Sequence, residues 1–451
     1  MRLPRLLLCA PSSGAGKTTV TCAVLQALQD LGYRPASFKS GPDYIDPMFH
    51  REVIGTYSAN LDLFLMGEEA VRAQLAETGG KAGLAVIEGA MGYYDGIAMG
   101  ETASAYDLAR RTRTPAVLVV NAKGQALSAA AVVKGIAAFR ADSQIQGVLL
   151  NRISPMSYPR LKEMIEAETG VRVYGFLPDS PDCTLESRHL GLVTAAEVDA
   201  LREKLSRLSA LAREHIDLEG LAGLAGTAPP LDAPAPALTV HPDHPRVAVA
   251  ADRAFCFYYG GALSLLEKLG ARLVEFSPLE DEALPAGVSG LYLGGGYPEL
   301  YAKRLSENQT MCRSVREAVE GGLPTVAECG GFLYLHRTME DGAGTPWPLC
   351  GVIPADAVRT DRLRRFGYIT MTPRTDGLLG SRPIPAHEFH YWESGAPGND
   401  FQARKPQSER GWDCAYHTPT LYAGFPHFHF CAVPEAAARF VAKCAEYNTG
   451  R

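Results

Sequence analysis

In the first half of the chain, short runs of consecutive apolar residues alternate with longer stretches whose apolar residues recur at helical spacing. Runs that are apolar at nearly every position are typical of parallel strands buried on both faces. The predicted strands are Leu6–Cys9, Ala36–Phe38, Leu84–Ile87, Ala116–Val120, Gly147–Leu150 and Val173–Phe176. Helices between such strands predict a doubly covered parallel sheet, in which ligands collect at the carboxyl ends of the strands.

The same alternation begins again after a segment of different composition. From about Gly220 to Pro245 the chain is rich in Pro, Ala and Gly, which disfavours helix and sheet and predicts a semi-extended linker. We therefore expect one α/β domain over residues 1–220, a linker over 221–245 and a second α/β domain over 246–451. In the second domain the predicted elements are the strands Arg246–Ala250, Arg272–Phe276, Gly290–Leu293 and Thr325–Ala327, a helix at Gly261–Leu269, and β-like segments at Leu349–Arg365 and Phe425–Ala432.

Composition narrows the class of protein. With 451 residues, of which 46% are hydrophobic and 21% charged, the chain has room for two or three packed cores. The net charge of −6 argues against general nucleic-acid binding, which needs a basic face. Ten cysteines without a C-x-x-C pair predict a protein of a reducing cytoplasm with no zinc site. No apolar run reaches the roughly 18 residues of a membrane span, so we expect no membrane association.

A glycine-rich loop joins the first predicted strand to the first predicted helix, in the order Ala-Pro-Ser-Ser-Gly-Ala-Gly-Lys-Thr-Thr over residues 10–19. Such a loop aims backbone N–H groups and the positive end of the helix dipole at phosphate oxygens, so it predicts an ATP site. Lys17 would reach the β- and γ-phosphates, and the Thr18 hydroxyl would bind Mg²⁺. A plain glycine turn before a helix is the alternative, disfavoured because strand, Lys-Thr pair and helix are all in place. The predicted ATP-binding residues of the loop are Ser13, Gly14, Gly16, Lys17, Thr18 and Thr19.

Polar residues follow several of the other predicted strands of the first half. Carboxylates and a lysine beside a phosphate loop suit Mg²⁺ and phosphorylated groups, because Mg²⁺ prefers hard oxygen ligands. Turns capped by aspartate, and a turn asparagine, are the alternatives for these segments. The residues at these strand ends are Lys39, Asp43 and Asp46, then Glu88 and Asp95, and finally Asn151, which could face the adenine edge.

In the second half, Cys329 stands between an apolar strand and an apolar helix, next to Gly330 and a further glycine. A strand–turn–helix of this kind exposes a thiol at a helix N-terminus, which favours the thiolate. The Gly330 N–H, and one from Gly295 in the turn after an earlier strand, would hold the oxyanion formed when the thiolate attacks. A buried structural cysteine is the alternative. Near the C-terminus, His427 and His429 lie on one face of a predicted strand, and either could serve as the base for Cys329.

Taken together, these motifs resemble the cobyrinic acid a,c-diamide synthase family, glutamine-dependent amidotransferases of corrinoid biosynthesis. The resemblance covers nearly the whole chain, with departures at Cys256, where the family pattern has asparagine, and Asn121, where it has aspartate. It is carried by residues 12–19, 38–47, 58–62, 87–96 and 188–192 (Arg-His-Leu-Gly-Leu) in the first half, and 254–259, 291–299, 328–331 and 387–390 in the second.

The resemblance implies a fold of two α/β domains. The first is an N-terminal P-loop domain with a parallel sheet like that of dethiobiotin synthetase, and the second is a class I glutamine amidotransferase-like domain. It implies that Cys329 and His427 release ammonia from L-glutamine. It also implies that ATP activates the a and c acetates of cobyrinic acid as acyl phosphates, with Mg²⁺ held by Thr18, Asp46 and Glu88. Lys39, Asp43 and Asp95 would then contact the substrate. In class I amidotransferases the usual third member of the triad is a glutamate two residues after the histidine, a position occupied here by His429, so the third member is left unassigned. A homodimer is compatible with the resemblance.

Other functions remain open at this point. Nickel-sirohydrochlorin and hydrogenobyrinic acid are alternative substrates for the same chemistry, and a carboxylation of the dethiobiotin type would leave the second half idle. A MinD-like ATPase switch carrying an inactive amidotransferase-like module is the alternative from another class. Ser12 stands where that group has its signature lysine, which weighs against the switch.

Overall fold

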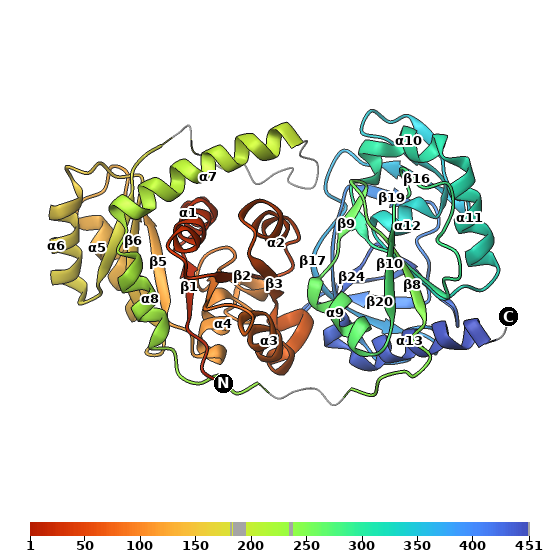
Figure 1. Ribbon diagram of the computed structural model, residues 1–451, viewed down its shortest axis with the longest axis horizontal. Helices are drawn as coiled ribbons and strands as arrows, with labels where there is room; N and C mark the ends of the chain where they lie inside the picture. Colours follow the sequence, from red (N-terminus) through yellow and green to blue (C-terminus); the bar gives the residue numbers. More distant parts are fainter. Residues whose placement is uncertain (181–182, 184–194, 234–237, 450–451) are drawn as a thin grey trace. The chain divides into compact units, whose positions relative to one another are not determined.

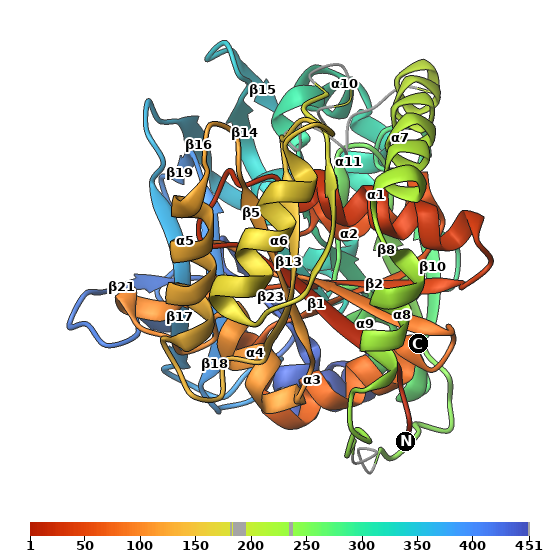
Figure 2. The same cartoon turned by 90° about the vertical axis from the view of Figure 1, so that its left-hand side faces the viewer.

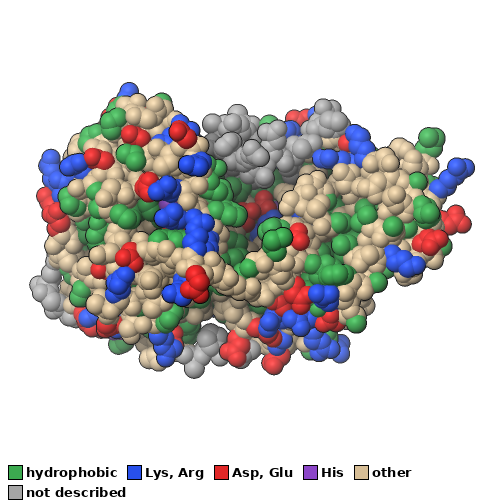
Figure 3. Space-filling model, turned by 180° about the vertical axis from the view of Figure 1, so that it is seen from behind, with side chains coloured by type: hydrophobic (Ala, Val, Ile, Leu, Met, Phe, Trp, Pro, Cys, Tyr) green, Lys and Arg blue, Asp and Glu red, His purple; other side chains and the backbone are tan. Residues whose placement is uncertain are grey.

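The computed structural model describes residues 1–180, 183, 195–233 and 238–449, and the chain separates into two compact units (Figure 1). The first comprises Met1–Leu63 with Gly67–Ala235, and the second Phe64–Met66 with Pro236–Arg451. The motif at residues 188–192 lies outside the described residues. In the part of the chain that is described, no helix has both the length and the apolarity that crossing a membrane requires. On the face seen in Figure 3, Lys and Arg side chains are interspersed with Asp and Glu.

The first unit is built on a seven-stranded sheet in the order β3-β2-β4-β1-β5-β6-β7, and every pairing in it is parallel. The six predicted strands are confirmed, and the sheet contains one more, β3, at its edge. The pattern missed β3 because its first residues are exposed or half-buried and polar Ser58 and Asn60 interrupt it. The strands are β1 Arg5–Cys9, β2 Pro35–Ser40, β3 Tyr57–Leu61, β4 Leu84–Glu88, β5 Ala116–Asn121, β6 Ile145–Asn151 and β7 Val173–Leu177.

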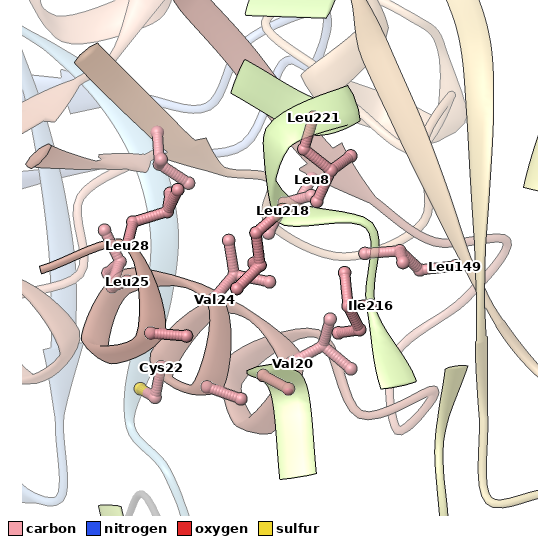
Figure 4. Packing of buried hydrophobic residues seen from close by; sticks show 14 of the residues in the cluster. Leu8, Val20, Cys22, Val24, Leu25, Leu28, Leu149, Ile216, Leu218 and Leu221 are labelled. Carbon is pink, nitrogen blue, oxygen red and sulfur yellow. The ribbon is translucent and has the colours of Figure 1, made fainter. Parts of the chain in front are cut away.

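Helices cover both faces of this sheet (Figures 1 and 2). On one face the apolar side of α1 packs with α7 and α8 over the sheet, in a core that includes Leu8, Val24, Leu149 and Leu221 (Figure 4). The helices α3 and α4 lie on the opposite face in Figure 1, and α5 packs against α6, with α5 contacting β5 and α6 contacting β7. The helices are α1 Lys17–Asp30, α2 Ile45–Phe49, α3 Leu63–Gly79, α4 Ala105–Thr112, α5 Leu127–Ala138, α6 Tyr158–Thr169, α7 Ala195–His215 and α8 Leu218–Gly226, with a short π-helix at His50–Ile54.

The linker begins later than predicted, because residues Leu218–Gly226 form the helix α8. Its sequence, Leu-Glu-Gly-Leu-Ala-Gly-Leu-Ala-Gly, is rich in glycine and was therefore expected to be non-helical. However, Leu218, Leu221 and Leu224 recur at helical spacing and are buried in the core of the first unit, and Asp217 caps the helix through the N–H of Gly220. Burial of one apolar face here outweighs the low helix propensity of glycine.

The second unit has a six-stranded sheet in the order β10-β8-β11-β13-β23-β22, parallel except for the last pair. It is flanked by α9 Gly260–Lys268, α10 Ala302–Glu307, α11 Gln309–Glu320, α12 Gly330–Tyr334 and α13 Pro434–Thr449. The four strands predicted in this half and the helix near residue 261 are confirmed. The strands are β8 Arg246–Ala250, β10 Arg272–Phe276, β11 Gly290–Leu293, β13 Thr325–Glu328, β22 Tyr416–His417 and β23 Leu421–Gly424.

Smaller sheets complete the second unit, with orders β12-β9, β15-β14-β16-β19 and β21-β20-β17-β18-β24. The predicted β-like segment 349–365 contains β16, but the segment 425–432 is strand only at His427–Phe428 and continues as a 3-10 turn. The strands are β9 Phe255–Phe257, β12 Gly295–Gly296, β14 His336–Glu340, β15 Pro346–Pro348, β16 Ile353–Arg359, β17 Arg365–Pro373, β18 Ile384–His390, β19 Trp392–Ser394, β20 Phe401–Arg404, β21 Gly411–Cys414 and β24 His427–Phe428.

Candidate functional site

The glycine-rich loop of the first unit lies between β1 and the N-terminus of α1, as predicted. Gly16 has φ 92°, and a Cβ added there would collide with Nδ2 of Asn151. That nitrogen donates to the carbonyl oxygen of Ala15 at 3.0 Å, so Asn151 holds the loop backbone. Ser13 and Gly14 are exposed at the tip of the loop. The loop has the shape of a phosphate cradle, and the amide nitrogen of Asn151 shapes that cradle.

The ammonium of Lys17 lies inside the loop, where it donates to the carbonyl oxygens of Ser12, at 3.1 Å, and Met91. Burial, and then the nearby charge of Lys39, lower the pKa of Lys17. The hydrogen-bond partners of this buried ammonium are carbonyl oxygens, so it gains stabilisation from a bound anion, and phosphate oxygens supply that charge in nucleotide-binding loops.

Beside the loop, four of the predicted residues form one buried cluster. Glu88, at the end of β4, accepts hydrogen bonds from Thr18 and Lys39, both at 2.7 Å. Lys39 also forms an ion pair with Asp46 at 2.5 Å. Burial raises the pKa of Glu88. Burial alone would lower the pKa of Lys39, but Glu88 and Asp46 raise it above its usual value.

The donor set of this cluster fits Mg²⁺. The second carboxylate oxygen of Glu88 is buried without a hydrogen-bond partner, and the Thr18 hydroxyl lies on the first. Within the described residues, no group of three His, Cys, Asp or Glu side chains could hold a metal alone. Mg²⁺ is commonly held by one or two carboxylates together with water and substrate phosphates, which is the arrangement that Thr18, Glu88 and Asp46 could support.

Asp43 and Asp95 have local roles in the loops that carry them. Asp43 accepts the backbone N–H groups of Ile45 at 2.8 Å and Asp46 at 3.2 Å, so it caps α2. Asp95 accepts the N–H of Gly92 at 3.1 Å. These contacts are those of the turn alternative, and the predicted contact of both residues with substrate stays a prediction. Asn60, which the pattern did not single out, donates to the carbonyl oxygen of Asp43 at 2.6 Å and fixes the same loop.

A cavity of about 520 Å³ opens beside the carboxyl ends of β5, β6 and β7. Its lining includes Lys123 and Asp179, which form an ion pair at 2.6 Å. Asn151 is the last residue of β6, next to Arg152 in the lining. The sequence pattern marked the strand ends but did not predict this cavity, because its lining comes from three separate loops.

In the second unit, Cys329 occupies a strained turn between β13 and α12. Its backbone has φ 47° and ψ −97°, a conformation that is costly for a residue with a Cβ and recurs at nucleophile positions. Its N–H donates to the carbonyl oxygen of Gly424 at 2.8 Å, which holds the turn against β23. Cys329 is half-buried.

The two predicted oxyanion glycines lie close together. A Cβ placed on Gly330 would lie 3.1 Å from the backbone nitrogen of Gly296 and 3.3 Å from the carbonyl carbon of Gly295. A Cβ placed on Gly295 would lie 2.5 Å from Cε1 of His427. The glycine turn, the start of α12 and the imidazole therefore surround one small space. The first N–H groups of a helix have no acceptor within the helix and can bind an oxyanion.

His427 connects the thiol to a carboxylate. Its Nδ1 lies 3.3 Å from Oε2 of Glu328, and its ring also hydrogen-bonds to the side chain of Cys329. Burial alone would lower the pKa of His427, but Cys329 and Glu328 together raise it to about 10. Tyr292 donates to the other oxygen of Glu328 at 3.1 Å. Glu328 thus has the place of the third triad member.

The sequence analysis did not predict Glu328 as the third member, because in class I amidotransferases the acid usually follows the histidine. The signal present in the sequence is a carboxylate at the end of an apolar strand, directly before Cys329. The other candidate base, His429, has a different environment: its Nδ1 accepts the N–H of Cys431 and its ring stacks on Tyr259. Burial lowers the pKa of His429 to about 3, so it is neutral at physiological pH. The structure therefore favours His427.

Comparison with known families matches two separate parts of the chain to two different domains. Residues 6–193 match the CobQ/CobB/MinD/ParA nucleotide binding domain, and residues 246–434 match the CobB/CobQ-like glutamine amidotransferase domain.

Three curated relatives match over almost their entire lengths, and each bears the name cobyrinate a,c-diamide synthase. The protein of Caldanaerobacter subterraneus is 39% identical over 97% of this chain and 97% of its own. That of Thermoplasma volcanium is 37% identical over 100% of this chain and 99% of its own. That of Listeria monocytogenes is 40% identical over 94% of this chain and 96% of its own.

Proposed function

The chain belongs to the cobyrinate a,c-diamide synthase family, and on that premise we propose that it amidates the a and c acetate groups of cobyrinic acid with ATP and L-glutamine. It is a carbon–nitrogen ligase that takes its amide nitrogen from glutamine. The observation that carries the proposal is the presence of two complete sets of groups in one chain. One is the cradle of Lys17, Thr18 and Glu88, and the other is the triad of Cys329, His427 and Glu328.

The triad supports release of ammonia from glutamine. The Cys329 thiolate attacks the side-chain amide carbon, and the N–H groups of Gly330 and of the Gly295 turn stabilise the oxyanion. His427, protonated beside Glu328, gives its proton to the departing ammonia, which leaves a thioester on Cys329. Water then attacks the thioester with His427 as the base, and glutamate leaves. The raised pKa of His427 keeps the proton available for the first of these steps.

The cradle supports activation of the acceptor carboxylate. A carboxylate is a poor electrophile, so its oxygen first attacks the γ-phosphorus of ATP, and ADP leaves. Ammonia then attacks the carbonyl carbon of the acyl phosphate, and inorganic phosphate leaves as the amide forms. Lys17 is placed to neutralise charge on the β- and γ-phosphates. Mg²⁺, held by Thr18, Glu88 and Asp46, would supply further charge neutralisation.

Two observations weigh against the ATPase switch as the alternative function. Ser12 replaces the signature lysine of that group, and the triad has the contacts of a working nucleophile and base. An inactive module would have no need to hold a strained cysteine against a histidine–carboxylate pair. Nickel-sirohydrochlorin and hydrogenobyrinic acid remain the alternative acceptors, because none of the groups described here distinguishes one macrocycle from another.

Mass spectrometry of cobyrinic acid incubated with the protein, ATP, Mg²⁺ and glutamine tests the proposal. We expect two successive conversions of a carboxylate to an amide. The Cys329→Ala variant should carry out both conversions only when ammonium replaces glutamine. A matched variant at another half-buried thiol, Cys431→Ala, should behave as wild type.

The outcomes separate the parts of the proposal. Glutamine hydrolysis without any mass change on cobyrinic acid would reject this acceptor and turn the test to the two alternative macrocycles. Absence of glutamine hydrolysis with all three macrocycles would reject the amidotransferase function itself.

A further inference from the structure

A second histidine, His387, lies against the triad base. The strands β18 and β24 pair so that His387 stands opposite His427. The two rings are stacked, with centroids 5.0 Å apart and planes inclined by 17°. His387 is buried, and none of the catalytic steps above uses it. The stack covers one face of the imidazole whose two nitrogens meet Glu328 and Cys329.

A buried tyrosine in turn holds His387. The hydroxyl of Tyr259 lies 2.8 Å from Nε2 of His387, and both residues are buried. The ring of Tyr259 stacks on His429, with centroids 4.8 Å apart and planes inclined by 26°. A hydrogen bond at the ring edge, together with stacking on its face, leaves the His387 imidazole little freedom to rotate.

The surroundings of the two histidines favour different protonation states for their rings. His427 faces Glu328 and Cys329, and its pKa is raised. Burial, then the charges of His427 and Lys405, hold the pKa of His387 well below its usual value. The charge of His427 also acts on Glu388, the residue after His387 on the same strand, where it opposes the rise in pKa that burial causes. A neutral ring therefore lies against the imidazolium and does not compete for its proton.

We propose that His387 is a positioning residue for glutamine hydrolysis, holding the His427 ring in the plane that presents Nδ1 to Glu328 and the other nitrogen to Cys329. A rotation of the His427 ring would lengthen both hydrogen bonds at once, because both nitrogens lie in the ring plane. Displacements of about 1 Å in such groups can cost about 100-fold in rate. The inference rests on the proposed role of Cys329 as the nucleophile.

Two variants at His387 test the proposal. His387→Gln keeps a polar group within reach of Tyr259 and loses the ring stack, whereas His387→Phe keeps a ring and loses the bond to Tyr259. We expect His387→Gln to lower kcat for glutamine hydrolysis by about 10- to 100-fold, with KM for glutamine and the ammonium-dependent amidation unchanged. The loss with His387→Phe should be smaller. His390→Phe is the control, because His390 is a buried histidine of the same strand whose ring stacks on Phe425.

The second readout is the rate at which iodoacetamide alkylates Cys329 at one fixed pH. A histidine held beside a thiol promotes the reaction of that thiol. If His387 aligns the His427 ring, the alkylation rate falls in His387→Gln and stays at the wild-type value in His390→Phe. A loss of kcat with an unchanged alkylation rate would show that His387 only packs the fold, and an unchanged kcat would overturn the proposal directly. Because alkylation needs no glutamine, this comparison still tests His387 if the wild-type protein fails to hydrolyse glutamine.

Discussion

The two centres of this protein differ in what each one contains before any substrate binds. In the first unit the positive groups have protein oxygens as partners: Lys17 lies on loop carbonyls, and Lys39 joins Glu88 to Asp46. In the second unit Cys329, His427 and Glu328, the groups that we propose as nucleophile, base and third triad member, already contact one another. The comparison teaches that the ammonium of Lys17 still lacks an anionic partner, which we expect the phosphates of the ligand to supply. The three groups of the thiol centre, in contrast, are brought together by the fold alone.

The largest effect is expected from a change in the thiol centre that leaves the nucleotide centre intact. Cys329→Ala removes the nucleophile and should lower glutamine-dependent amidation by about 10⁴-fold or more, while ammonium-dependent amidation remains. Parallel assays with each nitrogen source measure the difference. An equal loss of amidation with glutamine and with ammonium would mean that the nucleotide centre does not work without Cys329.

The reciprocal change is Lys17→Ala. Without the ammonium beside the phosphates, amidation should fall by about 10³-fold with glutamine and with ammonium alike. Hydrolysis of glutamine measured without ATP should stay near the wild-type rate, because the triad contains no group from the nucleotide loop. A large loss of that basal hydrolysis would contradict the comparison.

A third change tests whether Glu328 is the carboxylate partner of His427 in the thiol centre. Glu328→Gln removes the carboxylate from His427 and should lower kcat for glutamine hydrolysis by about 100-fold. Glu328 helps to raise the pKa of His427 to about 10, so its loss lowers that pKa and the imidazole loses its proton at a lower pH.

The alkaline limb of the pH–rate profile of Glu328→Gln should therefore move toward neutral pH. Asp356→Asn, at a half-buried carboxylate of the same unit that pairs with Arg337 at 2.6 Å, is the matched control and should leave the limb in place. An unmoved limb in Glu328→Gln would remove Glu328 from the triad.

A smaller effect is expected from the shape of the nucleotide loop. Gly14 and Gly16 both have positive φ, but only at Gly16 does an added Cβ meet Asn151; at Gly14 nothing lies within 4 Å. Each alanine carries a backbone penalty of roughly 1–2 kcal/mol. Gly16→Ala must also displace the Asn151 amide, so it should weaken ATP binding by about tenfold more than Gly14→Ala, since tenfold in affinity is about 1.4 kcal/mol. Calorimetric titration with ATP checks this, and adding Asn151→Ala should recover part of the loss; equal effects of the two alanines would refute it.

The last prediction concerns stability in acid and does not involve the rate of either reaction. Among the described residues of the second unit, burial lowers the pKa of His336 to about 4, and those of His390 and His429 to about 3. Among the described residues of the first unit, the only such value is that of His50, lowered to about 4. A histidine with a depressed folded pKa binds fewer protons when folded, so stability is lost as the pH falls from 6.5 toward these values, by about 1.4 kcal/mol per histidine and pH unit.

The second unit should therefore open first on acidification. All three tryptophans, Trp347, Trp392 and Trp412, belong to it, so fluorescence follows this unit alone. Hydrogen exchange with mass spectrometry follows the first unit in the same samples. Opening of the first unit at the higher pH would contradict the expectation.

The same contrast explains what the sequence could predict. The nucleotide cradle is built from neighbours in the chain, so the order of Gly16, Lys17 and Thr18 was enough to recognise it. The role of Asn151 depends on a contact 136 residues away in the sequence, and no local pattern reports it. Glu328 was hidden for a related reason: its partner His427 is distant in sequence and close only through the pairing of β13, β23 and β24 with their neighbours.

In the fold, errors came from segments whose burial departs from their composition. The edge strand β3 carries polar residues because one side of it has no neighbouring strand. The helix α8 contains glycines that a composition rule reads as linker, although its leucines are buried. Tertiary packing decided both cases, and local propensity is a weak guide where packing is strong.

In a regular strand, consecutive side chains point to opposite faces of the sheet. Glu328 and Cys329 are consecutive, yet both reach the same imidazole, because the left-handed backbone at Cys329 ends the alternation at that residue. Two thirds of the triad are thus encoded by adjacent codons. An insertion between them would separate the carboxylate from the thiol, so in any lineage of such chains the two groups should be inherited, or lost, as a pair.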